Sequence, residues 1–549
     1  MKDGKHTLVT ASLVNLGLVS LAAVLFTASF PNPLFANGLS FAAWLAYVPV
    51  FWVTRRAGIA ACAVFGAFYG YASYTLFNYW LTSFHPVAAI LVGSIYLVYM
   101  ALLFPLLHIA FRFFPRRGYI LQFLLWMAYE YLRTLGFLGY SYGISGYSQW
   151  SFLPLIQIAS ITGVWGVSAL VVFPAAWLSA ALHQPSIKNF FHRERVPILV
   201  WFALLAASLV YGFASPVNYT QARKLRFALV QHNTDPWNPS HLPVQSQALA
   251  QYRNDFLVLQ RLSDEALQAH PDTDFVVWSE TAFVPRIYWH QTIRDDPASW
   301  RLVRELLDYL AAQNVPFLIG NNDGRKEPAV NPSGDNRVSY NAAILFDKGE
   351  IAEVYRKMHL VPFTEYFPYK KQFPAVYAVL KNANTYFWEA GKERTIFQHE
   401  GIRFASPICF EDTFGYISRD FVRNGAEVIV NLSNDVWAKS LPAQMQHLGM
   451  AVFRTVENRR SMVRSTSSGQ TAAIDPNGRI LAMAEPFTEA WLSAEVPLVD
   501  TATLYTRYGD YLGVFFTAAA CALLLYGIVL YILEIVQRRT RLTNCKHTN

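Results

Sequence analysis

Three short motifs of the sequence carry side chains that could act together in acyl transfer. Glu280 ends the apolar run Phe275–Glu280, Lys357 lies in the run Tyr355–Glu365, and Cys409 stands where an apolar strand gives way to a helix. A thiol must lose its proton before it attacks a carbonyl carbon, and a carboxylate can accept that proton. An ammonium group and a backbone N–H can stabilise the oxyanion that follows. The three residue types therefore predict a nucleophilic cysteine site, provided that the fold brings them together.

Each of these residues also has an ordinary interpretation when it is taken alone. Glu280 could be a solvated carboxylate at a strand end, and Lys357 could be a surface lysine. Cys409 could be a small buried residue without chemistry. It is, however, the only cysteine between residues 215 and 505. In an oxidising compartment, a lone thiol is a liability unless it is buried or used.

The elements that would position these residues follow the pattern of an α/β protein. Within residues 215–505, apolar runs of strand length such as Ile402–Phe410 and Val428–Ser433 alternate with helical stretches such as Ala298–Gln313 and Pro442–Asn458. Strands separated by helices of this length predict one layered α/β domain. Ligands of such domains bind at the carboxyl ends of strands, which favours a site role for Glu280.

The composition of the whole chain is that of a membrane protein. Of the 549 residues, 53% are hydrophobic and only 15% are charged, whereas roughly 25% charged is usual in soluble domains. A membrane span needs about 20 apolar residues. Eight such runs are predicted, at residues 9–29, 38–54, 57–82, 87–112, 118–136, 159–182, 196–214 and 511–534. We therefore expect seven spans in residues 1–214, a polar domain in 215–505, and an eighth span with a basic tail in 506–549.

The cationic residues of the membrane region indicate how it is oriented. Lysine and arginine occupy every second connection between the apolar runs: Lys2, Lys5, Arg55, Arg56, Arg112, Arg116, Arg117, Lys188, Arg193 and Arg195. The positive-inside rule then predicts that both termini are cytoplasmic and that residues 215–505 lie on the opposite face. The net charge of the chain is +8. The same placement indicates that its lysine and arginine residues orient a membrane protein and do not bind nucleic acid.

The order and local motifs of Glu280, Lys357 and Cys409 resemble the Glu-Lys-Cys triad of the nitrilase superfamily. This resemblance implies an α-β-β-α sandwich in which Glu280 is the general base, Lys357 stabilises the oxyanion and Cys409 is the nucleophile. Glu365, at the end of the Lys-x-His-Leu-Val-Pro-Phe-x-Glu run, matches the superfamily's second glutamate. Glu411 is predicted to be a further supporting residue.

A nitrilase-like domain placed between seven spans and one resembles, more specifically, the apolipoprotein N-acyltransferases of bacterial envelopes. The runs Lys357–Glu365, Asn431–Trp437 and Glu457–Arg459 match that family, as do Glu130 and Arg133 of the fifth apolar run. The resemblance implies a multi-pass protein of the bacterial inner membrane with a periplasmic catalytic domain. It further implies that a glycerophospholipid, phosphatidylethanolamine, gives an acyl chain to Cys409, which passes it to the α-amine of a diacylglyceryl apolipoprotein. The sequence predicts no metal or other cofactor, because the 13 histidines lack ligand spacing and no glycine-rich phosphate loop is present.

Further residues are candidates for substrate contact. Aromatic side chains favour membrane interfaces, so Phe367, Trp388 and Trp437 are predicted to form lids over a lipid cavity; the alternative is that they belong to the domain core. Glu130 and Arg133 lie three residues apart on one helix face, where they could pair with each other or contact a lipid headgroup.

Two other functions remain compatible with parts of the sequence. A membrane-anchored nitrilase-type amidase would use the same triad to hydrolyse a carbon–nitrogen bond, although a single anchor would suffice for it. A transporter or receptor with an inactive binding domain would not need an intact triad. Modification of Cys409 by a fatty acyl group would distinguish the acyltransferase from both.

Overall fold

The computed structural model describes residues 2–83, 85–235, 245–326, 337–367, 369–382 and 387–546. The chain divides into two compact units. Met1–Ala214 and Asp510–Asn549 form the helical unit, and Ser215–Gly509 form the sheet unit.

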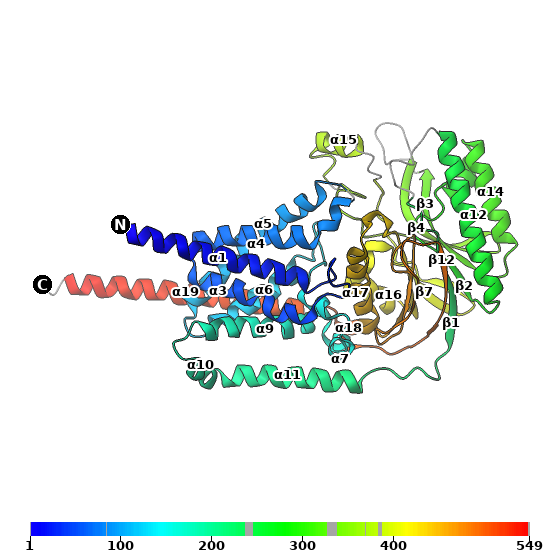
Figure 1. The fold of residues 1–549 in the computed structure, drawn as a ribbon. Helices are drawn as coiled ribbons and strands as arrows, with labels where there is room; N and C mark the ends of the chain where they lie inside the picture. Colours follow the sequence, from blue (N-terminus) through cyan, green and yellow to red (C-terminus); the bar gives the residue numbers. More distant parts are fainter. Residues whose placement is uncertain are drawn as a thin grey trace. The chain divides into compact units, whose positions relative to one another are not determined.

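The helical unit contains long apolar helices joined by short segments (Figure 1). Its elements are α1 (Lys2–Ala28), η1 (Ser40–Ala42), α2 (Ala43–Ala46), α3 (Val48–Arg56), α4 (Ile59–Phe77), η2 (Tyr79–Ser83), α5 (Ala88–Phe113), α6 (Gly118–Leu132), η3 (Ser145–Gln149), α7 (Leu153–Ile156), α8 (Ala159–Thr162), α9 (Val164–Leu182), α10 (Ile187–Arg193), α11 (Arg195–Ala214) and α19 (Tyr511–Lys546). Within the described residues, six helices are long and apolar enough to cross a membrane: α1, α4, α5, α9, α11 and α19. The predicted class, a polytopic helical membrane region, is confirmed.

Two of the eight predicted spans form shorter helices than expected. The run 38–54 is divided among η1, α2 and α3, with Pro49 in the first turn of α3, where a residue without an N–H fits best. Helix α6 has 15 residues, which at 1.5 Å per residue gives about 22 Å, less than the roughly 30 Å of a bilayer core. The apolar runs were therefore recognised correctly, but two of them do not form one long helix each.

Helices α4 and α5 approach each other closely at two glycines. A Cβ atom added to Gly66 would lie 2.3 Å from the Met100 carbonyl oxygen, and one added to Gly70 would lie 2.2 Å from the Tyr96 carbonyl oxygen. Gly66 and Gly70 lie four residues apart, the small-residue spacing that lets membrane helices pack backbone to backbone. Only glycine fits at these two positions.

The sheet unit contains two six-stranded sheets. The first has the order β12-β1-β2-β3-β4-β5 and the second the order β11-β10-β9-β8-β7-β6. Their strands are β1 (Lys224–Gln231), β2 (Phe275–Trp278), β3 (Phe317–Lys326), β4 (Arg337–Asp347), β5 (Glu350–Arg356), β6 (Phe397–His399), β7 (Ile402–Ala405), β8 (Val428–Ser433), β9 (Ser461–Thr466), β10 (Ala472–Ile474), β11 (Ile480–Met483) and β12 (Ala490–Pro497). Strands β1, β2 and β3 are parallel neighbours, as are β7, β8 and β9.

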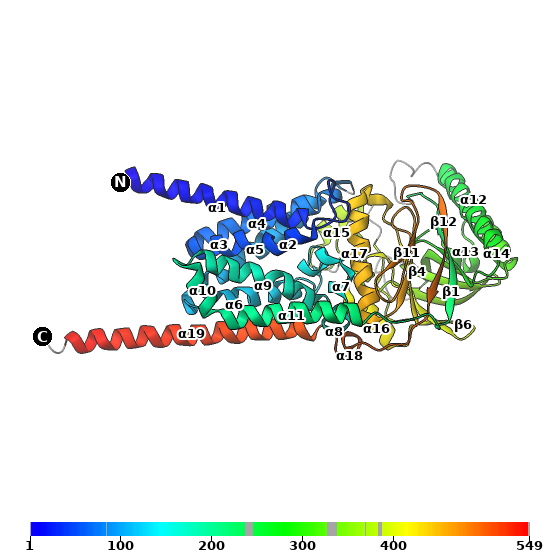
Figure 2. The same ribbon diagram turned by 60° about the horizontal axis from the view of Figure 1, so that its bottom comes forward.

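Helices cover the outer faces of both sheets. The helical elements of this unit are α12 (Gln245–Ala269), α13 (Ile287–Thr292), α14 (Pro297–Ala311), α15 (Pro374–Asn382), η5 (Cys409–Thr413), α16 (Gly415–Arg423), η6 (Val436–Ala438), α17 (Leu441–Asn458) and α18 (Leu504–Tyr508). Helices α12 and α14 lie side by side on one outer side of the strands, and α16 and α17 lie on the other (Figures 1 and 2). The predicted α-β-β-α sandwich is confirmed.

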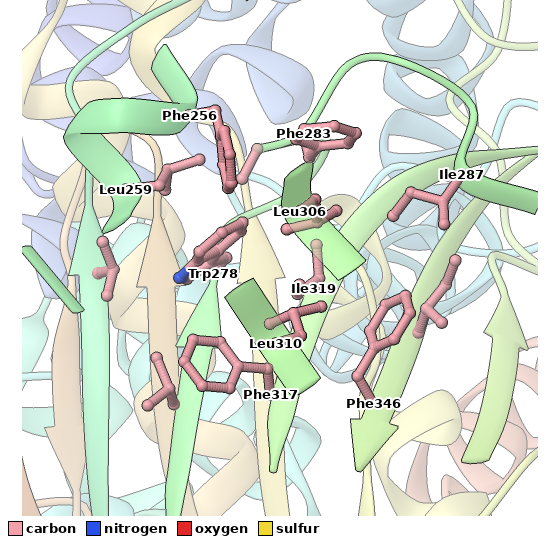
Figure 3. Close-up of a cluster of buried hydrophobic side chains, with 14 of the residues drawn as sticks. Phe256, Leu259, Trp278, Phe283, Ile287, Leu306, Leu310, Phe317, Ile319 and Phe346 are labelled. Carbon is pink, nitrogen blue, oxygen red and sulfur yellow. The ribbon is translucent and has the colours of Figure 1, made fainter. Parts of the chain in front are cut away.

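The core under α12 and α14 holds the strand that leads to Glu280. Trp278 of β2 is fully buried, and its indole N–H donates to the Ser263 hydroxyl of α12 at 2.9 Å. Figure 3 shows Trp278 among Phe256 and Leu259 of α12 and Leu306 and Leu310 of α14, with further apolar residues from β3 and β4 around them. Burying side chains of this size contributes about 1.5–3 kcal/mol each, so the end of β2 has a well-defined position.

The two sheets contact each other beside the strands that carry the predicted site. The Ser465 hydroxyl of β9 lies 3.1 Å from the carbonyl oxygens of Val230 and Val277 in the first sheet. The rings of Phe275 in β2 and Phe404 in β7 lie edge to face, with centroids 5.3 Å apart. The strands that precede Glu280 and Cys409 are thus packed against each other.

Candidate active site

Glu280 lies just beyond the carboxyl end of β2, as predicted from the strand pattern. The backbone turns sharply at the next residue, Thr281, which has a φ of 51°. The Glu280 side chain is almost completely buried, and its Oε1 accepts a hydrogen bond of 2.7 Å from the Asn341 amide of β4. This amide holds the carboxylate in one orientation.

Lys357 directly follows β5 and lies between two carboxylates. Its Nζ donates to Glu365 Oε1 at 2.8 Å and to Glu280 Oε1 at 3.4 Å, and its side chain is 0% exposed. Burial lowers the pKa of the Lys357 ammonium, but the charges of Glu365 and Glu280 outweigh burial and hold that pKa above its ordinary value. Lys357 is therefore a fixed positive charge throughout the physiological pH range.

Glu365 belongs to the segment after Lys357 and turns back onto it. Its Oε2 accepts a hydrogen bond of 2.9 Å from the Val361 N–H, and its carbonyl oxygen accepts one of 2.9 Å from the Trp388 N–H. Burial raises the pKa of the Glu365 carboxyl, although the Lys357 ammonium opposes this effect. Glu365 thus holds the Lys357 ammonium together with Glu280.

Cys409 is the first residue of η5 and has a φ of 50°, a left-handed conformation that is uncommon for non-glycine residues. Its side chain is partly exposed. Burial among neighbouring groups raises the pKa of the thiol well above its ordinary value, the Glu280 carboxylate raises it further, and the Lys357 ammonium lowers it. The charges of Glu280 and Lys357 therefore both act on the Cys409 thiol, and the catalytic roles of the three residues remain a prediction.

Glu411 joins the segment that carries Lys357 to the segment that carries Cys409. Its Oε1 accepts hydrogen bonds from the backbone N–H groups of Met358 and His359 at 2.8 and 3.0 Å, and its Oε2 accepts one from the Ile408 N–H at 2.8 Å. The Tyr355 hydroxyl donates to the same carboxylate at 2.8 Å. Burial raises the pKa of Glu411, although these donors oppose the shift. Glu411 is a link between two backbone segments and is itself remote from solvent.

The predicted lid residues lie in different surroundings. Phe367 is buried and its ring is stacked with that of Tyr377 at a centroid distance of 6.5 Å. Trp388 is also buried, next to Glu365 through its backbone. Trp437 lies in η6 and is partly exposed. Their use as lids remains a prediction.

Glu130 and Arg133 of the helical unit bind the following loop and form no ion pair with each other within 4.0 Å. The Arg133 guanidinium donates to the Tyr96 hydroxyl at 2.8 Å and to the carbonyl oxygens of Tyr140 and Tyr142 at 2.9 Å. Glu130 accepts hydrogen bonds from the N–H and the hydroxyl of Ser145. Both residues therefore anchor the loop after α6, and contact of either side chain with a lipid headgroup remains a prediction.

Sequence reasoning did not find a buried group of charges in the sheet unit. Asp412, Asp435, His447 and Arg464 contact one another there. Asp435 belongs to a matched motif, but only the fold brings it to His447 and Arg464. Within the part of the chain that the structure describes, no group of three or more His, Cys, Asp or Glu side chains could hold a metal ion.

The sequence is similar to known protein families over most of its length. The apolipoprotein N-acyltransferase N-terminal domain family matches residues 22–177, and the carbon-nitrogen hydrolase family matches residues 227–505. The chain is 45% identical over 522 residues to apolipoprotein N-acyltransferase 1 of Treponema denticola, covering 92% of this chain and 94% of that protein. The chain belongs to the apolipoprotein N-acyltransferase family.

Two further comparisons extend this result. Apolipoprotein N-acyltransferase 1 of Treponema pallidum is 46% identical over 544 residues, which cover 94% of this chain and 96% of that protein. Among solved structures, Nit3 of Saccharomyces cerevisiae, a member of branch 10 of the nitrilase superfamily, is 20% identical with a TM-score of 0.33, over 50% of this chain and 90% of that one. The membership of this chain in the N-acyltransferase family thus extends over both of its units.

Proposed function

We propose that this protein transfers a fatty acyl chain from a glycerophospholipid to the α-amine of an apolipoprotein's N-terminal diacylglyceryl-cysteine. The proposal is supported by the buried contact of Lys357 with Glu280, and by Glu411, which ties the segment after Lys357 to the residue before Cys409, in a chain of this family. The Lys357 ammonium lies 3.4 Å from Glu280, and both charges act on the Cys409 thiol. Phosphatidylethanolamine is the proposed donor.

In the first half-reaction, Glu280 accepts the proton of the Cys409 thiol and the sulfur attacks the ester carbonyl of the phospholipid. The oxyanion that forms is stabilised by the Lys357 ammonium. The carbon–oxygen bond of the ester then breaks, and the proton held by Glu280 passes to the departing lysophospholipid alkoxide. The product is a thioester between Cys409 and the acyl chain.

In the second half-reaction, the neutral α-amine of the acceptor attacks the thioester. Glu280 accepts a proton from that nitrogen, the carbon–sulfur bond breaks, and the proton returns to Cys409. An amide is formed and the free thiol is regenerated. The lysophospholipid leaves before the acceptor reacts, so two-substrate kinetics should be of the ping-pong type.

A bilayer location follows from the substrates. Each buried CH₂ group contributes about 0.8 kcal/mol, so extracting a two-chain lipid into water would be very costly. We place the sheet unit on the periplasmic face of the inner membrane with both termini in the cytoplasm, because of the distribution of lysine and arginine.

Incubation of the purified full-length chain with phospholipid labelled in its acyl chains tests the proposal. We expect mass spectrometry to find the labelled chain on the Cys409 peptide, in a form that neutral hydroxylamine releases. Cys409→Ala should abolish it, whereas Cys521→Ser, a change at an exposed thiol of α19, should leave it intact. Hydrolysis of small amides without any acyl adduct on Cys409 would favour the amidase alternative and end the proposal.

A further inference from the structure

A closed group of four charges lies inside the sheet unit beside the proposed nucleophile. Asp412 belongs to η5, Asp435 follows β8, His447 lies in the middle of α17, and Arg464 belongs to β9. None of the four is more than 5% exposed. The half-reactions described above assign no role to any of them.

The contacts alternate between positive and negative groups. His447 Nε2 lies 2.6 Å from Asp412 Oδ1, and its Nδ1 lies 3.0 Å from Asp435 Oδ1. The Arg464 guanidinium contacts Asp412 and lies 3.6 Å from Asp435 Oδ2. Because both nitrogens of the imidazole face a carboxylate, both must carry a proton. Two carboxylates are therefore balanced by an imidazolium and a guanidinium.

Two carboxylates of this group are close to Cys409 in the chain or act on its thiol. Asp412 follows Cys409 by three residues within the same short helix. Asp435 is among the charged groups that act on the thiol, together with Glu280, Lys357 and Glu365. Loss of one cation from the group would leave a buried, unbalanced carboxylate next to the nucleophile, and loss of one carboxylate would leave an unbalanced cation.

We propose that Asp412, Asp435, His447 and Arg464 set the reactivity of the Cys409 thiol through their charge balance, with His447 as a positioning residue that stays protonated. The inference rests on the proposed role of Cys409 as the nucleophile. Burial lowers the pKa of His447, but Asp412 and Asp435 outweigh burial and raise it to about 9, which agrees with the geometry. His447 accordingly acts by its charge and exchanges no proton with a substrate.

Alkylation of Cys409 by iodoacetamide, followed over pH by mass spectrometry of its peptide in the full-length chain, tests this proposal without any acyl transfer. Neutral hydroxylamine is applied first to free the thiol. His447→Gln should slow alkylation at pH 8 by about tenfold, which corresponds to a shift of about one pKa unit. Asp435→Asn should accelerate alkylation by a similar factor. The double variant D435N/H447Q, which restores the balance, should lie close to the unmodified chain.

A merely structural role cannot explain alkylation rates that change in opposite directions in H447Q and D435N and return in the double variant. Packing lost through one substitution would not be repaired by a second. Glu495→Gln, which removes one partner of the surface ion pair with Arg226, is the control and should leave the alkylation profile unchanged. Shifts of the same sign in H447Q and D435N, or a double variant no closer to the unmodified chain than H447Q, would overturn the proposal. If D435N fails to fold, Asp412→Asn removes the other carboxylate and must accelerate alkylation.

The two proposals can fail separately. A chain that forms no thioester with phospholipid but still shows opposite alkylation shifts would refute the acyltransferase chemistry and keep the charge-balance inference. A chain that forms the thioester with an unchanged alkylation profile in H447Q would refute the inference and keep the chemistry.

Discussion

At the level of single residues, the site holds a thiol, two carboxylates and one ammonium in a buried space. The charge of Glu280 is one reason why the Cys409 thiol keeps its proton. When that proton moves to Glu280, the negative charge moves to the sulfur and the total charge is unchanged. In the proposed reaction, the Lys357 ammonium stabilises this thiolate and then the oxyanion.

Replacement of Lys357 by methionine should remove this stabilisation while roughly preserving side-chain volume. We expect the rate of thioester formation with labelled phospholipid to fall by about 10²–10³, the usual effect of losing one oxyanion donor. Lys370→Met, which alters an exposed lysine paired with Glu389, is the control and should retain the full rate. Equal rates in both variants would exclude an electrostatic role for Lys357.

His447 should make stability dependent on pH. Its folded pKa of about 9 lies above the value of roughly 6.5 expected in the unfolded chain. The stabilisation is therefore fully present below pH 6.5 and is lost as pH rises through 9. The difference amounts to about 3 kcal/mol. Thermal unfolding of the detergent-solubilised chain should show a midpoint that falls between pH 6.5 and 9, and H447Q should fall less over the same interval; a parallel fall in both would contradict the assignment.

At the level of elements, the active site depends on how loops are joined beyond the strand ends. Glu411 accepts hydrogen bonds from both the segment after β5 and the residue before Cys409. This link is needed because the two residues come from different sheets. Lys357 follows β5 of the first sheet, and Cys409 follows β7 of the second. The carboxylate of Glu411 thus connects the segment that follows Lys357 to the residue that precedes Cys409.

Substitution of Glu411 by glutamine should disconnect one of the two segments, since one of its acceptor oxygens becomes an NH₂ donor. We expect the unfolding free energy to drop by about 1–3 kcal/mol and thioester formation to slow by at least tenfold. Tyr355→Phe removes only the hydroxyl donor to the same carboxylate and leaves its backbone donors in place. Its effect on the rate should be much smaller, and equal losses in both variants would argue against a linking role for Glu411.

The close packing of α4 and α5 gives a prediction for the helical unit. Gly70→Ala places a methyl group 2.2 Å from the Tyr96 carbonyl oxygen, so the helices must separate, at about 1–3 kcal/mol. Gly17→Ala in α1, where nothing lies within 4 Å of the added Cβ, is the matched control and should be neutral or slightly stabilising. Thermal unfolding of the two variants in detergent measures the difference, and equal midpoints would contradict the packing argument.

The sequence predicted those features that depend on local pattern. The strand ending at Glu280 and the apolar helices could be recognised from hydrophobic periodicity, whereas the sandwich was implied by the resemblance of the motifs to the nitrilase superfamily. The division of the run 38–54 and the shortness of α6 could not, because composition does not determine where one helix ends inside an apolar stretch. The group around His447 was also missed, since Asp412, His447 and Arg464 meet only after η5, α17 and β9 have packed.

At the level of the whole molecule, arginine side chains from different connections of the helical unit contact a common partner. Arg117 and Arg193 both pair with Glu194, at 3.1 and 2.9 Å, although they come from connections far apart in the chain. The Arg112 guanidinium lies over the ring of Tyr531 in α19. Figure 1 shows α10, the start of α1 and the end of α19 at the same end of this unit. By the positive-inside rule, this gathering predicts that the surface is the cytoplasmic one.

Cysteine labelling in spheroplasts tests the orientation. In a chain whose four cysteines are replaced by serine, Glu495→Cys introduces a thiol at an exposed position of β12, and Lys188→Cys introduces one at an exposed position of α10. If the sheet unit is periplasmic, a membrane-impermeant maleimide should label the first variant in intact spheroplasts and the second only after permeabilisation, because α10 carries the cations that remain inside. The reverse result would place the proposed nucleophile in the cytoplasm, away from outer-leaflet phospholipids and from exported apolipoproteins.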